Sequence, residues 1–267
     1  RACSMELSAM RVLLYPEFGR MEMADVPAPP PPGADEVTLR VAACGICGSE
    51  LEGFKLRSPR RTPPLILGHE FCGVIEDCGS AVRDWAAGAR VVCNALVPCG
   101  RCGRCERGDT HLCATRQIFG MNRQGAFAER VNVPARCLLP WPDTLTAGEA
   151  CLAEPLGNGV HVARLTAHLR VETAVIVGAG PIGLFCQQAL QVLRGARTIV
   201  ADLSDERLAV AQRLGAMRTV NPRTADLIAI VREETGGEGA DLAVDAVGGA
   251  VTKRTALDAV RPGGAAV

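Results

Sequence analysis

Four cysteines are concentrated in one short, polar stretch of the chain, CGRCGRCERGDTHLC. They are Cys99, Cys102, Cys105 and Cys113, so three stand at every third position and the fourth follows eight residues after the last of them. Four thiolates suit one tetrahedral zinc ion, and a closed shell of this kind leaves no coordination position for chemistry. A loop this hydrophilic has no core in which unrelated cysteines could be buried. We therefore expect a structural zinc in a lobe at residues 93–116, with a rubredoxin-like iron site as the alternative.

A second group of potential metal ligands is divided between two motifs, GICGSE and LGHEFCG. The first motif places Cys47 in a glycine-flanked turn after an apolar strand, and the second places His69 and Glu70 at the start of another strand. Sulfur, imidazole and carboxylate together suit zinc. These three residues are therefore candidates for a second metal site.

The sequence VIVGAGPIG has the pattern of a dinucleotide-binding turn between an apolar strand and a helix. Glycines in such a turn permit a tight bend and a close approach of pyrophosphate to the backbone. The strand that follows ends in TIVAD and places Asp202 about 20 residues beyond the glycines. A carboxylate at this point accepts hydrogen bonds from the ribose hydroxyls and repels a 2′-phosphate, so NAD is favoured over NADP. The expected cofactor-binding residues are Gly178, Gly180, Pro181, Ile182, Gly183 and Asp202.

The elements that must position these residues differ between the two halves of the chain. In residues 1–156, short apolar runs such as VTLRVAAC, VVCNALV and FAERVNV are interrupted by Gly and Pro, which predicts an irregular, mostly β domain. In residues 157–267, apolar strands alternate with amphipathic helices, which predicts a doubly wound parallel sheet. The length of 267 residues also favours two domains, because one core rarely grows beyond roughly 250 residues.

The composition excludes several classes of partner. Twenty-nine basic residues balance 29 acidic ones, so no net charge favours nucleic acid or an anionic membrane, and we expect a small-molecule ligand. No apolar run reaches the roughly 18 residues of a membrane helix, and the first residues lack a secretory pattern. Cysteines in a reducing compartment are more often metal ligands or buried apolar residues than disulfide partners. We therefore expect a cytoplasmic protein.

The stretch GHEFCGVIEDCGSAV resembles the pattern of the zinc-dependent alcohol dehydrogenases: GHE, two residues, Gly, five residues, Gly, two residues and an apolar residue. The motifs GICGSE, the four-cysteine lobe and VGAGPIG also stand in the order and at the spacing of this medium-chain dehydrogenase family, and the resemblance runs from about Met10 to Val267. It implies a GroES-like β-barrel domain that carries both zinc ions, followed by a Rossmann NAD-binding domain, with the active site in the cleft between them. Family members continue past the RPGG turn, so we expect this chain to be C-terminally truncated, and to form a homodimer or homotetramer when full length.

The resemblance also assigns roles around the second metal site. Cys47 and His69 are expected to be ligands of the catalytic zinc, Glu70 a ligand or near neighbour, and Glu154 in AEPLG a further ligand. Glutamate at this last position is similar to the sorbitol, polyol and threonine dehydrogenase branch. Cys151 is a weaker candidate, because a small buried residue is the more usual role there.

Proton transfer and ligand orientation are expected of the residues that follow Cys47. Ser49 stands where the family has a Ser or Thr that takes the proton of the zinc-bound alcohol. Glu50 replaces the usual Asp that orients a ligand imidazole. Glu52 stands where many relatives have His, so the exit route of the proton is expected to differ and to run through water.

Together these features predict a zinc-dependent oxidoreductase that transfers hydride from a secondary alcohol, such as a polyol or sugar alcohol, to NAD and yields a ketone. An activity like that of L-threonine 3-dehydrogenase or butanediol dehydrogenase is the alternative, and a non-catalytic zinc- and NAD-binding fragment is a second one. The remaining charged or imidazole side chains near these motifs are expected to be packing or surface residues: His111, His161, His168 and Arg207.

Overall fold

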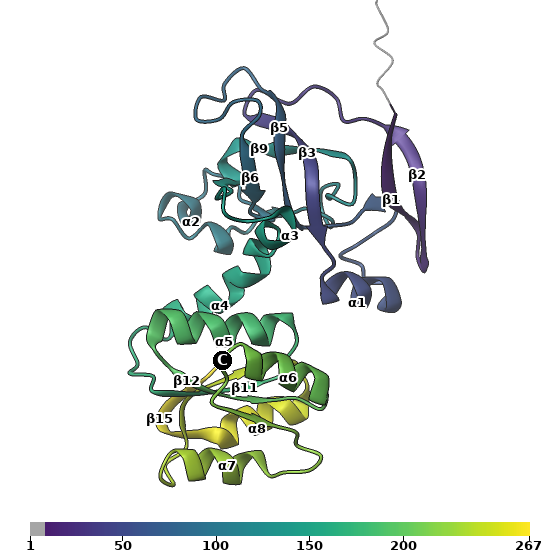
Figure 1. Cartoon of the computed structure of the whole chain (residues 1–267). Coiled ribbons are helices and arrows are strands. Elements are labelled where there is room, and N and C mark those ends of the chain that lie inside the picture. Colours follow the sequence, from purple (N-terminus) through teal and green to yellow (C-terminus); the bar gives the residue numbers. More distant parts are fainter. Residues whose placement is uncertain (1–8) are drawn as a thin grey trace, which may run out of the picture. The chain divides into compact units, whose positions relative to one another are not determined.

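The computed structural model describes residues 9–267, which form two compact units (Figure 1). The first unit extends to Glu154, and the second comprises Pro155–Val267. The division lies two residues before the expected boundary after residue 156, inside a helix, α4 (Ala153–Leu165). Each unit has its own buried clusters of apolar side chains.

The first unit is built from antiparallel strands, as the short apolar runs predict. A five-stranded sheet has the order β10-β6-β5-β3-β9, and a three-stranded sheet has the order β2-β1-β4. A small hairpin, β7 and β8, stands apart from both sheets. The strands are β1 (Ala9–Glu17), β2 (Arg20–Pro27), β3 (Glu36–Gly45), β4 (Leu65–Ile66), β5 (Glu70–Cys78), β6 (Arg90–Cys93), β7 (Leu96–Val97), β8 (Gln117–Ile118), β9 (Arg130–Pro134) and β10 (Leu138–Pro140).

The core of the first unit lies on one face of the five-stranded sheet. Val37 and Leu39 in β3 and Phe71 and Ile75 in β5 are buried and belong to one cluster, because alternate side chains of a strand point to the same face. Phe71 meets Phe119 edge-on, with ring centroids 5.4 Å apart. This core fixes the adjacent ends of β3 and β5, from which the candidate metal ligands project.

Short helices connect the strands of the first unit. The first, α1 (Gly48–Leu56), follows β3 directly, and α3 (Ala147–Ala150) precedes the division between the units. The others are α2 (Gly103–Glu106) and the 3₁₀ helices η1 (Thr110–Leu112) and η2 (Ala135–Cys137). Among the described residues, no helix is both long enough and apolar enough to cross a membrane.

The second unit is a five-stranded parallel sheet with helices on both faces (Figure 1). The strand order β13-β12-β11-β14-β15 is that of a doubly wound nucleotide-binding fold, which confirms the predicted architecture. Its strands are β11 (Thr173–Val177), β12 (Arg197–Ala201), β13 (Arg218–Val220), β14 (Ala240–Asp245) and β15 (Val260–Ala266). Its helices, besides α4, are α5 (Pro181–Arg194), α6 (Asp205–Arg213), α7 (Leu227–Glu234) and α8 (Ala250–Ala259).

The strands of this sheet are apolar on both sides because both faces are covered. All five residues of β11 are buried. Ala174 and Ile176 belong to the cluster that includes residues of α5, whereas Val175 and Val177 belong to the cluster that includes residues of α7 and α8. The sequence of β11 is therefore continuously apolar rather than alternating between apolar and polar residues.

One of the short apolar runs contains a polar residue that divides it. The sequence VVCNALV forms two strands, β6 and β7, with Asn94 between them. The Asn94 side-chain oxygen accepts a hydrogen bond from Leu96 N at 3.0 Å, and the backbone N–H of Asn94 donates to Cys137 O. These local bonds turn the chain out of the sheet and into the four-cysteine lobe.

Asp241 ties three strands of the parallel sheet together. One carboxylate oxygen accepts from the N–H groups of Glu172 and Thr173 at 2.8 and 2.9 Å, and the other accepts from Arg261 Nε at 2.7 Å. Burial raises the pKa of Asp241, but the hydrogen bonds from Thr173, Arg261 and Glu172 outweigh it, so the pKa is lowered. The carboxylate therefore stabilises the folded state while it is ionised.

We expect D241N to lower the free energy of unfolding at pH 7 by about 1–3 kcal/mol, because an amide nitrogen would face backbone N–H donors. A carboxyl whose pKa is lowered on folding contributes stability above its unfolded value of about 3.9 and loses it as the pH falls through the folded value. The difference between wild type and D241N should thus shrink below about pH 4. Urea unfolding followed by circular dichroism at several pH values measures it.

D258N is the matched control, because Asp258 forms an exposed pair with Arg254 on α8. Exposed pairs contribute about 0–1 kcal/mol, so this variant should change the unfolding free energy little. Equal losses in the two variants would show that Asp241 has no special role in the sheet.

Candidate active site

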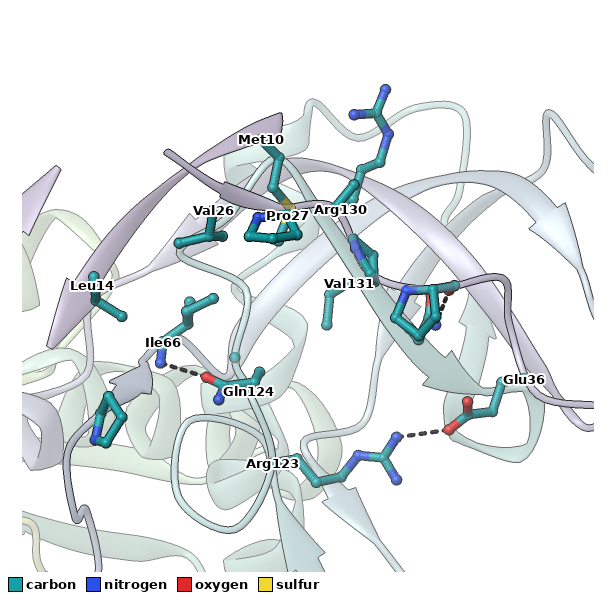
Figure 2. Close-up of a pocket in the computed structure, with 16 residues that line it drawn as sticks. Met10, Leu14, Val26, Pro27, Glu36, Ile66, Arg123, Gln124, Arg130 and Val131 are labelled. Carbon is teal, nitrogen blue, oxygen red and sulfur yellow. Dashed lines mark hydrogen bonds and ion pairs between the residues drawn. The ribbon is translucent and has the colours of Figure 1, made fainter. Parts of the chain in front are cut away.

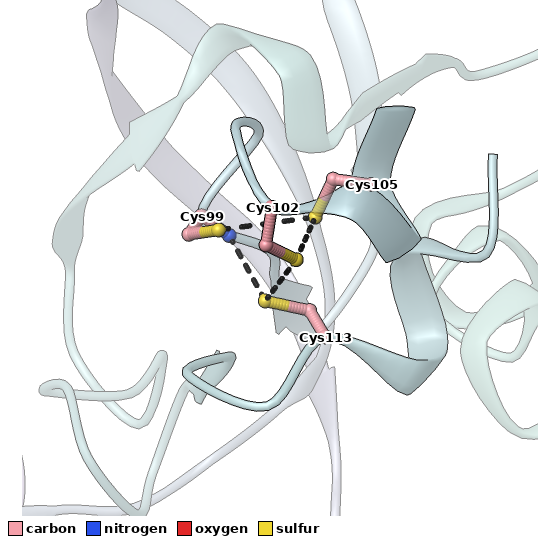
Figure 3. A group of neighbouring side chains, drawn as sticks. All are labelled: Cys99, Cys102, Cys105 and Cys113. Atoms are coloured by element: carbon pink, nitrogen blue, oxygen red, sulfur yellow. Dashed lines mark hydrogen bonds between the residues drawn. The ribbon is translucent and has the colours of Figure 1, made fainter. Parts of the chain in front are cut away.

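The four-cysteine lobe is closed at its base by the β7–β8 hairpin, in which Leu96 pairs with Ile118 and Val97 with Gln117. The cysteines converge from separate turns of this loop (Figure 3). The sulfur of Cys105 lies 3.9 Å from that of Cys99 and 3.5 Å from that of Cys102, and the sulfurs of Cys102 and Cys113 are 4.0 Å apart. Zinc–sulfur bonds of about 2.3 Å in a tetrahedron place sulfurs about 3.8 Å apart, so the four sulfurs fit one zinc ion.

Backbone N–H groups favour the thiolate form of two of these cysteines. Hydrogen bonds from the backbone of Arg101 and then from the side chain of Thr115 lower the pKa of Cys99 to about 6. The N–H of Cys99 donates to Cys113 Sγ at 3.4 Å and lowers the pKa of that thiol. Desolvation, followed by the neighbouring Cys102, raises the pKa of Cys105 to about 11. The lobe therefore supplies ready thiolates for the metal, which in turn must displace the proton of Cys105.

The second donor set combines residues from the ends of β3 and β5. Cys47 is the residue before the first turn of α1, and Glu70 is the first residue of β5, as the sequence predicts. The ligand atoms of Cys47, His69 and Glu70 all lie within 4.8 Å of one another. His69 and Glu70 are buried and Cys47 is half-buried. This set fits a single metal ion of zinc type.

Glu50 holds the imidazole of His69 and joins it to the turn that carries Cys47. Its Oε1 lies 3.0 Å from His69 Nδ1 and also accepts the Gly68 N–H at 2.7 Å, while its Oε2 accepts the Cys47 N–H at 3.1 Å. A donor bond from Nδ1 to a carboxylate leaves Nε2 free to bind a metal. The Glu50 side chain therefore reaches the imidazole that the usual Asp would be expected to orient.

The charge around His69 favours a cation at this point. Burial lowers the pKa of His69, but the hydrogen bonds to Cys47 and Glu50 outweigh it and raise the pKa to about 10. The same negative surroundings favour a metal ion, which competes with that proton for the ring nitrogen.

Glu70 reaches the donor set because the opposite residue on β3 has no side chain. Gly45 pairs with Glu70 in the β3–β5 ladder. A Cβ on Gly45 would lie 2.3 Å from Glu70 Oε2, so any larger residue would displace the carboxylate.

Ser49 and Glu154 lie at the edge of the set. The Ser49 hydroxyl donates to Cys47 Sγ at 3.2 Å, which places it beside a candidate metal ligand. Glu154 is not part of the three-residue set. Burial raises the pKa of Glu154, and the charges of His69, Glu70 and Glu50 act on it as well, so its carboxylate lies close enough to these residues to interact with them electrostatically.

Other sequence candidates lie outside the site. Cys151 packs in a buried cluster with Cys72 and Trp141, and its sulfur contacts the Gly148 carbonyl at 3.2 Å. The three exposed histidines belong to no metal-binding group among residues 9–267: His111, His161 and His168.

Sequence patterns gave no sign of one further residue, Arg61. It is buried, with 3% of its surface exposed, and its guanidinium contacts Ser49. It stands in the run SPRRTPP, which has the composition of an exposed loop. A tertiary contact of this kind leaves no periodic pattern that could have revealed it.

In the second unit, the glycine turn links β11 to α5 as predicted. The N–H of Gly178 donates to Ala201 O at 2.7 Å, which holds the turn against β12. A Cβ on Gly183 would lie 1.8 Å from Gly178 O, so only glycine allows α5 to begin so close to the strand. The N-terminal end of α5 is thereby left available for an anionic group.

Asp202 follows β12 and reaches the same turn. Its Oδ2 accepts from Ala179 N at 2.7 Å, and its Oδ1 accepts from Ser204 N at 2.9 Å. Arg207 at the start of α6 is mostly exposed, with one guanidinium nitrogen 3.8 Å from Asp202 Oδ2.

A cavity of about 530 Å³ lies elsewhere in the first unit (Figure 2). Its walls are mostly apolar and include Met10, Val26 and Ile66, and a pair between Arg123 and Glu36 at 2.7 Å forms its polar side. None of the residues that line this cavity belongs to either metal donor set. The cavity is therefore separate from the candidate active site.

Comparison with known proteins matches both units to one enzyme family. Residues 33–143 match the alcohol dehydrogenase GroES-like domain, and residues 181–267 match the zinc-binding dehydrogenase domain. The chain is 34% identical to L-threonine 3-dehydrogenase of Chromobacterium violaceum over 91% of this chain and 72% of that protein. It is 36% identical to L-idonate 5-dehydrogenase of Vitis vinifera over 87% of this chain and 66% of that protein.

A solved structure from Sinorhizobium meliloti, described as a candidate zinc-binding dehydrogenase bound to NADP, superposes with a TM-score of 0.90. It is 34% identical, and the match covers 97% of this chain and 76% of that one. The chain therefore belongs to the zinc-dependent medium-chain dehydrogenases, with a GroES-like domain followed by a Rossmann-type sheet. The resemblance drawn from the sequence motifs is confirmed.

The two donor sets predict two zinc ions per chain with separable roles. C47S should lose one zinc and all turnover while keeping its fold, because Cys47 lies in the turn between β3 and α1 rather than in the lobe. C105S should lose the other zinc and unfold more easily. Zinc content by plasma mass spectrometry and urea unfolding measure both effects.

C78S is the control, since Cys78 is a half-buried thiol that belongs to neither set. It should retain both zinc ions. A wild-type protein that holds a single zinc after loading would contradict the presence of two sites.

Proposed function

We propose that this protein oxidises a secondary alcohol of the polyol or sugar-alcohol class to a ketone, with NAD as the hydride acceptor. The observation that carries the proposal is the buried donor set of Cys47, His69 and Glu70, with Glu50 behind the imidazole and the Ser49 hydroxyl beside the sulfur. A set with three protein donors suits a catalytic zinc, because it leaves a coordination position for substrate.

The residues of the chain supply orientation and proton handling. When bound, zinc acts as a Lewis acid that lowers the pKa of a coordinated hydroxyl group. Glu50 fixes the imidazole through Nδ1. Ser49 holds a hydroxyl next to Cys47 Sγ, where it can exchange a hydrogen bond with the substrate hydroxyl. Glu154 is proposed either as a fourth ligand, which the substrate hydroxyl would have to displace, or as a proton acceptor, and its raised pKa suits the second role.

Glu154 also supports a polyol rather than a simple alcohol as substrate, since a glutamate in this position is similar to the polyol and threonine dehydrogenase branch. Threonine is the second candidate substrate, because several curated relatives are L-threonine 3-dehydrogenases. A non-catalytic protein is disfavoured because binding alone would not require a serine hydroxyl directed at the metal ligand.

We also propose a cytoplasmic location and a homodimeric or homotetrameric assembly. All described cysteines are free thiols, which fits a reducing compartment.

Dehydrogenase assays separate the candidate substrates. With zinc-loaded protein and NAD, we expect the highest kcat/KM with sorbitol or xylitol, and lower values with 2,3-butanediol and threonine. C47S is the inactive control. The highest kcat/KM with threonine would identify the second candidate, and no turnover of any of these substrates by fully loaded protein would reject the proposal.

The position of Asp202 leads us to propose NAD rather than NADP. Its two oxygens have about four lone-pair sites, of which Ala179 and Ser204 occupy two, so the others can accept from ribose hydroxyls. A 2′-phosphate would meet this carboxylate at close range and be repelled. Because the Sinorhizobium meliloti relative was solved with NADP bound, the affinities of this protein for NAD and NADP need to be compared directly.

We expect the affinity for NAD to exceed that for NADP by at least about tenfold, or about 1.4 kcal/mol. D202G should narrow this ratio, because it removes the repulsive charge and leaves Arg207 free to meet a phosphate. D205N is the control: Asp205 lies nearby but bonds to Asn221, so its loss should leave the ratio unchanged. Fluorescence titration measures both dinucleotides, and equal affinities in the wild type would show that Asp202 does not contact the ribose.

A further inference from the structure

Arg61 is a buried cation placed directly behind the candidate active site. It lies in the segment between α1 and β4, with 3% of its surface exposed. One guanidinium nitrogen donates to the Ser49 carbonyl at 2.9 Å and another donates to Ser49 Oγ at 3.0 Å, whereas Nε has no hydrogen-bond partner. Arginine is rarely buried in this way without a compensating role.

The surroundings of Arg61 are shaped to admit it and to balance its charge. Gly53 faces the side chain, and a Cβ there would lie 3.0 Å from Arg61 Cδ. Burial lowers the pKa of Arg61, but the negative charges of Glu50, Cys47 and Glu52 oppose this effect in that order. The guanidinium thus keeps its charge beside the donor set.

A guanidinium can donate hydrogen bonds but cannot accept them, whereas a serine hydroxyl has one proton and two lone pairs. The bond from Arg61 occupies one lone pair of Ser49 Oγ, so the Ser49 proton must point elsewhere. The available acceptor is Cys47 Sγ at 3.2 Å, on the metal side of the serine. A hydroxyl that accepts from a cation is also a stronger donor.

Building on the proposed function, we propose that Arg61 is a positioning residue that fixes the Ser49 proton toward Cys47 Sγ and so leaves the second lone pair of Ser49 Oγ to accept a hydrogen bond from the substrate hydroxyl. Arg61 itself cannot carry the proton onward. The two hydrogen bonds to a single residue also require the planar guanidinium fork, which a lysine ammonium cannot reproduce.

A double-mutant cycle tests whether Arg61 acts through Ser49. R61M should lower kcat for the alcohol about tenfold and change KM little, because one charged hydrogen bond is lost from the reacting arrangement. S49A should lower kcat at least as much, and S49A/R61M should lie within about twofold of S49A. Additive losses in the double variant would overturn the proposal.

R61K and R60M complete the comparison. R61K keeps the positive charge and can form one of the two hydrogen bonds to Ser49, so it should recover part of the kcat that R61M loses. Arg60 is exposed and adjacent, so R60M should stay within about twofold of wild type. If R61M does not fold, the cycle is completed with R61K and S49A/R61K, with the same criterion of non-additivity.

A spectroscopic measurement separates this inference from the proposed function, because it needs no turnover. Cobalt(II) is introduced at the Cys47 site while zinc stays in the four-cysteine lobe, and the sulfur-to-cobalt charge-transfer band is recorded. Loss of the Ser49 hydrogen bond to Cys47 Sγ should shift this band to longer wavelength in S49A and R61M, with no further shift in the double variant.

The two proposals therefore fail in different ways. A band shift in a wild-type protein that oxidises no alcohol would reject the proposed function and leave the role of Arg61 intact. An active wild type with an unshifted band in R61M would reject the role of Arg61 alone.

Discussion

The buried carboxylate of Glu50 connects the two parts of the chain that carry the second donor set. It accepts hydrogen bonds from Cys47 N and Gly68 N, and it contacts His69 Nδ1 at 3.0 Å. These bonds hold the turn after β3 and the turn before β5 in a fixed position relative to each other. Without this carboxylate, the buried N–H of Gly68, the N–H of Cys47 and the imidazole of His69 would all lose their partner. The geometry of the site and the local fold therefore depend on the same side chain.

The donor set also concentrates charge that the fold alone does not balance. Three carboxylates, from Glu50, Glu70 and Glu154, lie near one thiol, while the nearby basic groups are His69 and Arg61. Buried anions are costly unless they are paired or bind a metal. A divalent cation at this site would therefore balance the negative charge and stabilise the region, in addition to its chemical role.

Local patterns predicted the features that depend on neighbouring residues. The four-cysteine motif around Cys102 and the glycine turn around Gly180 each lie within one short segment. Their geometry follows from the residue types in that segment, so both motifs can be recognised from the sequence. Asp202 was predictable because the βαβ unit fixes its distance from the turn. The alternation of strands and helices likewise predicted the doubly wound sheet of the second unit, because each βαβ unit places its two strands parallel to each other.

Features that depend on distant contacts could not be predicted in this way. Arg61 lies twelve residues from Ser49 in a loop with no periodicity, and only the packed structure shows that it is buried. Gly45 resembles any turn glycine until the ladder places Glu70 opposite it. The break between β6 and β7 depends on the side chain of Asn94, which competes with the sheet for backbone hydrogen bonds.

The four-cysteine lobe is closed by its own short hairpin, and this has a consequence for the order of assembly. All four sulfurs come from the span between Cys99 and Cys113, whereas the second donor set joins residues on different strands. Closing a short loop costs less conformational entropy than bringing distant strands together. When the complete chain refolds, the lobe can therefore capture its ion as soon as its own hairpin forms. The second set must await the pairing of β3 with β5, so a refolding chain would fill the two positions one after the other.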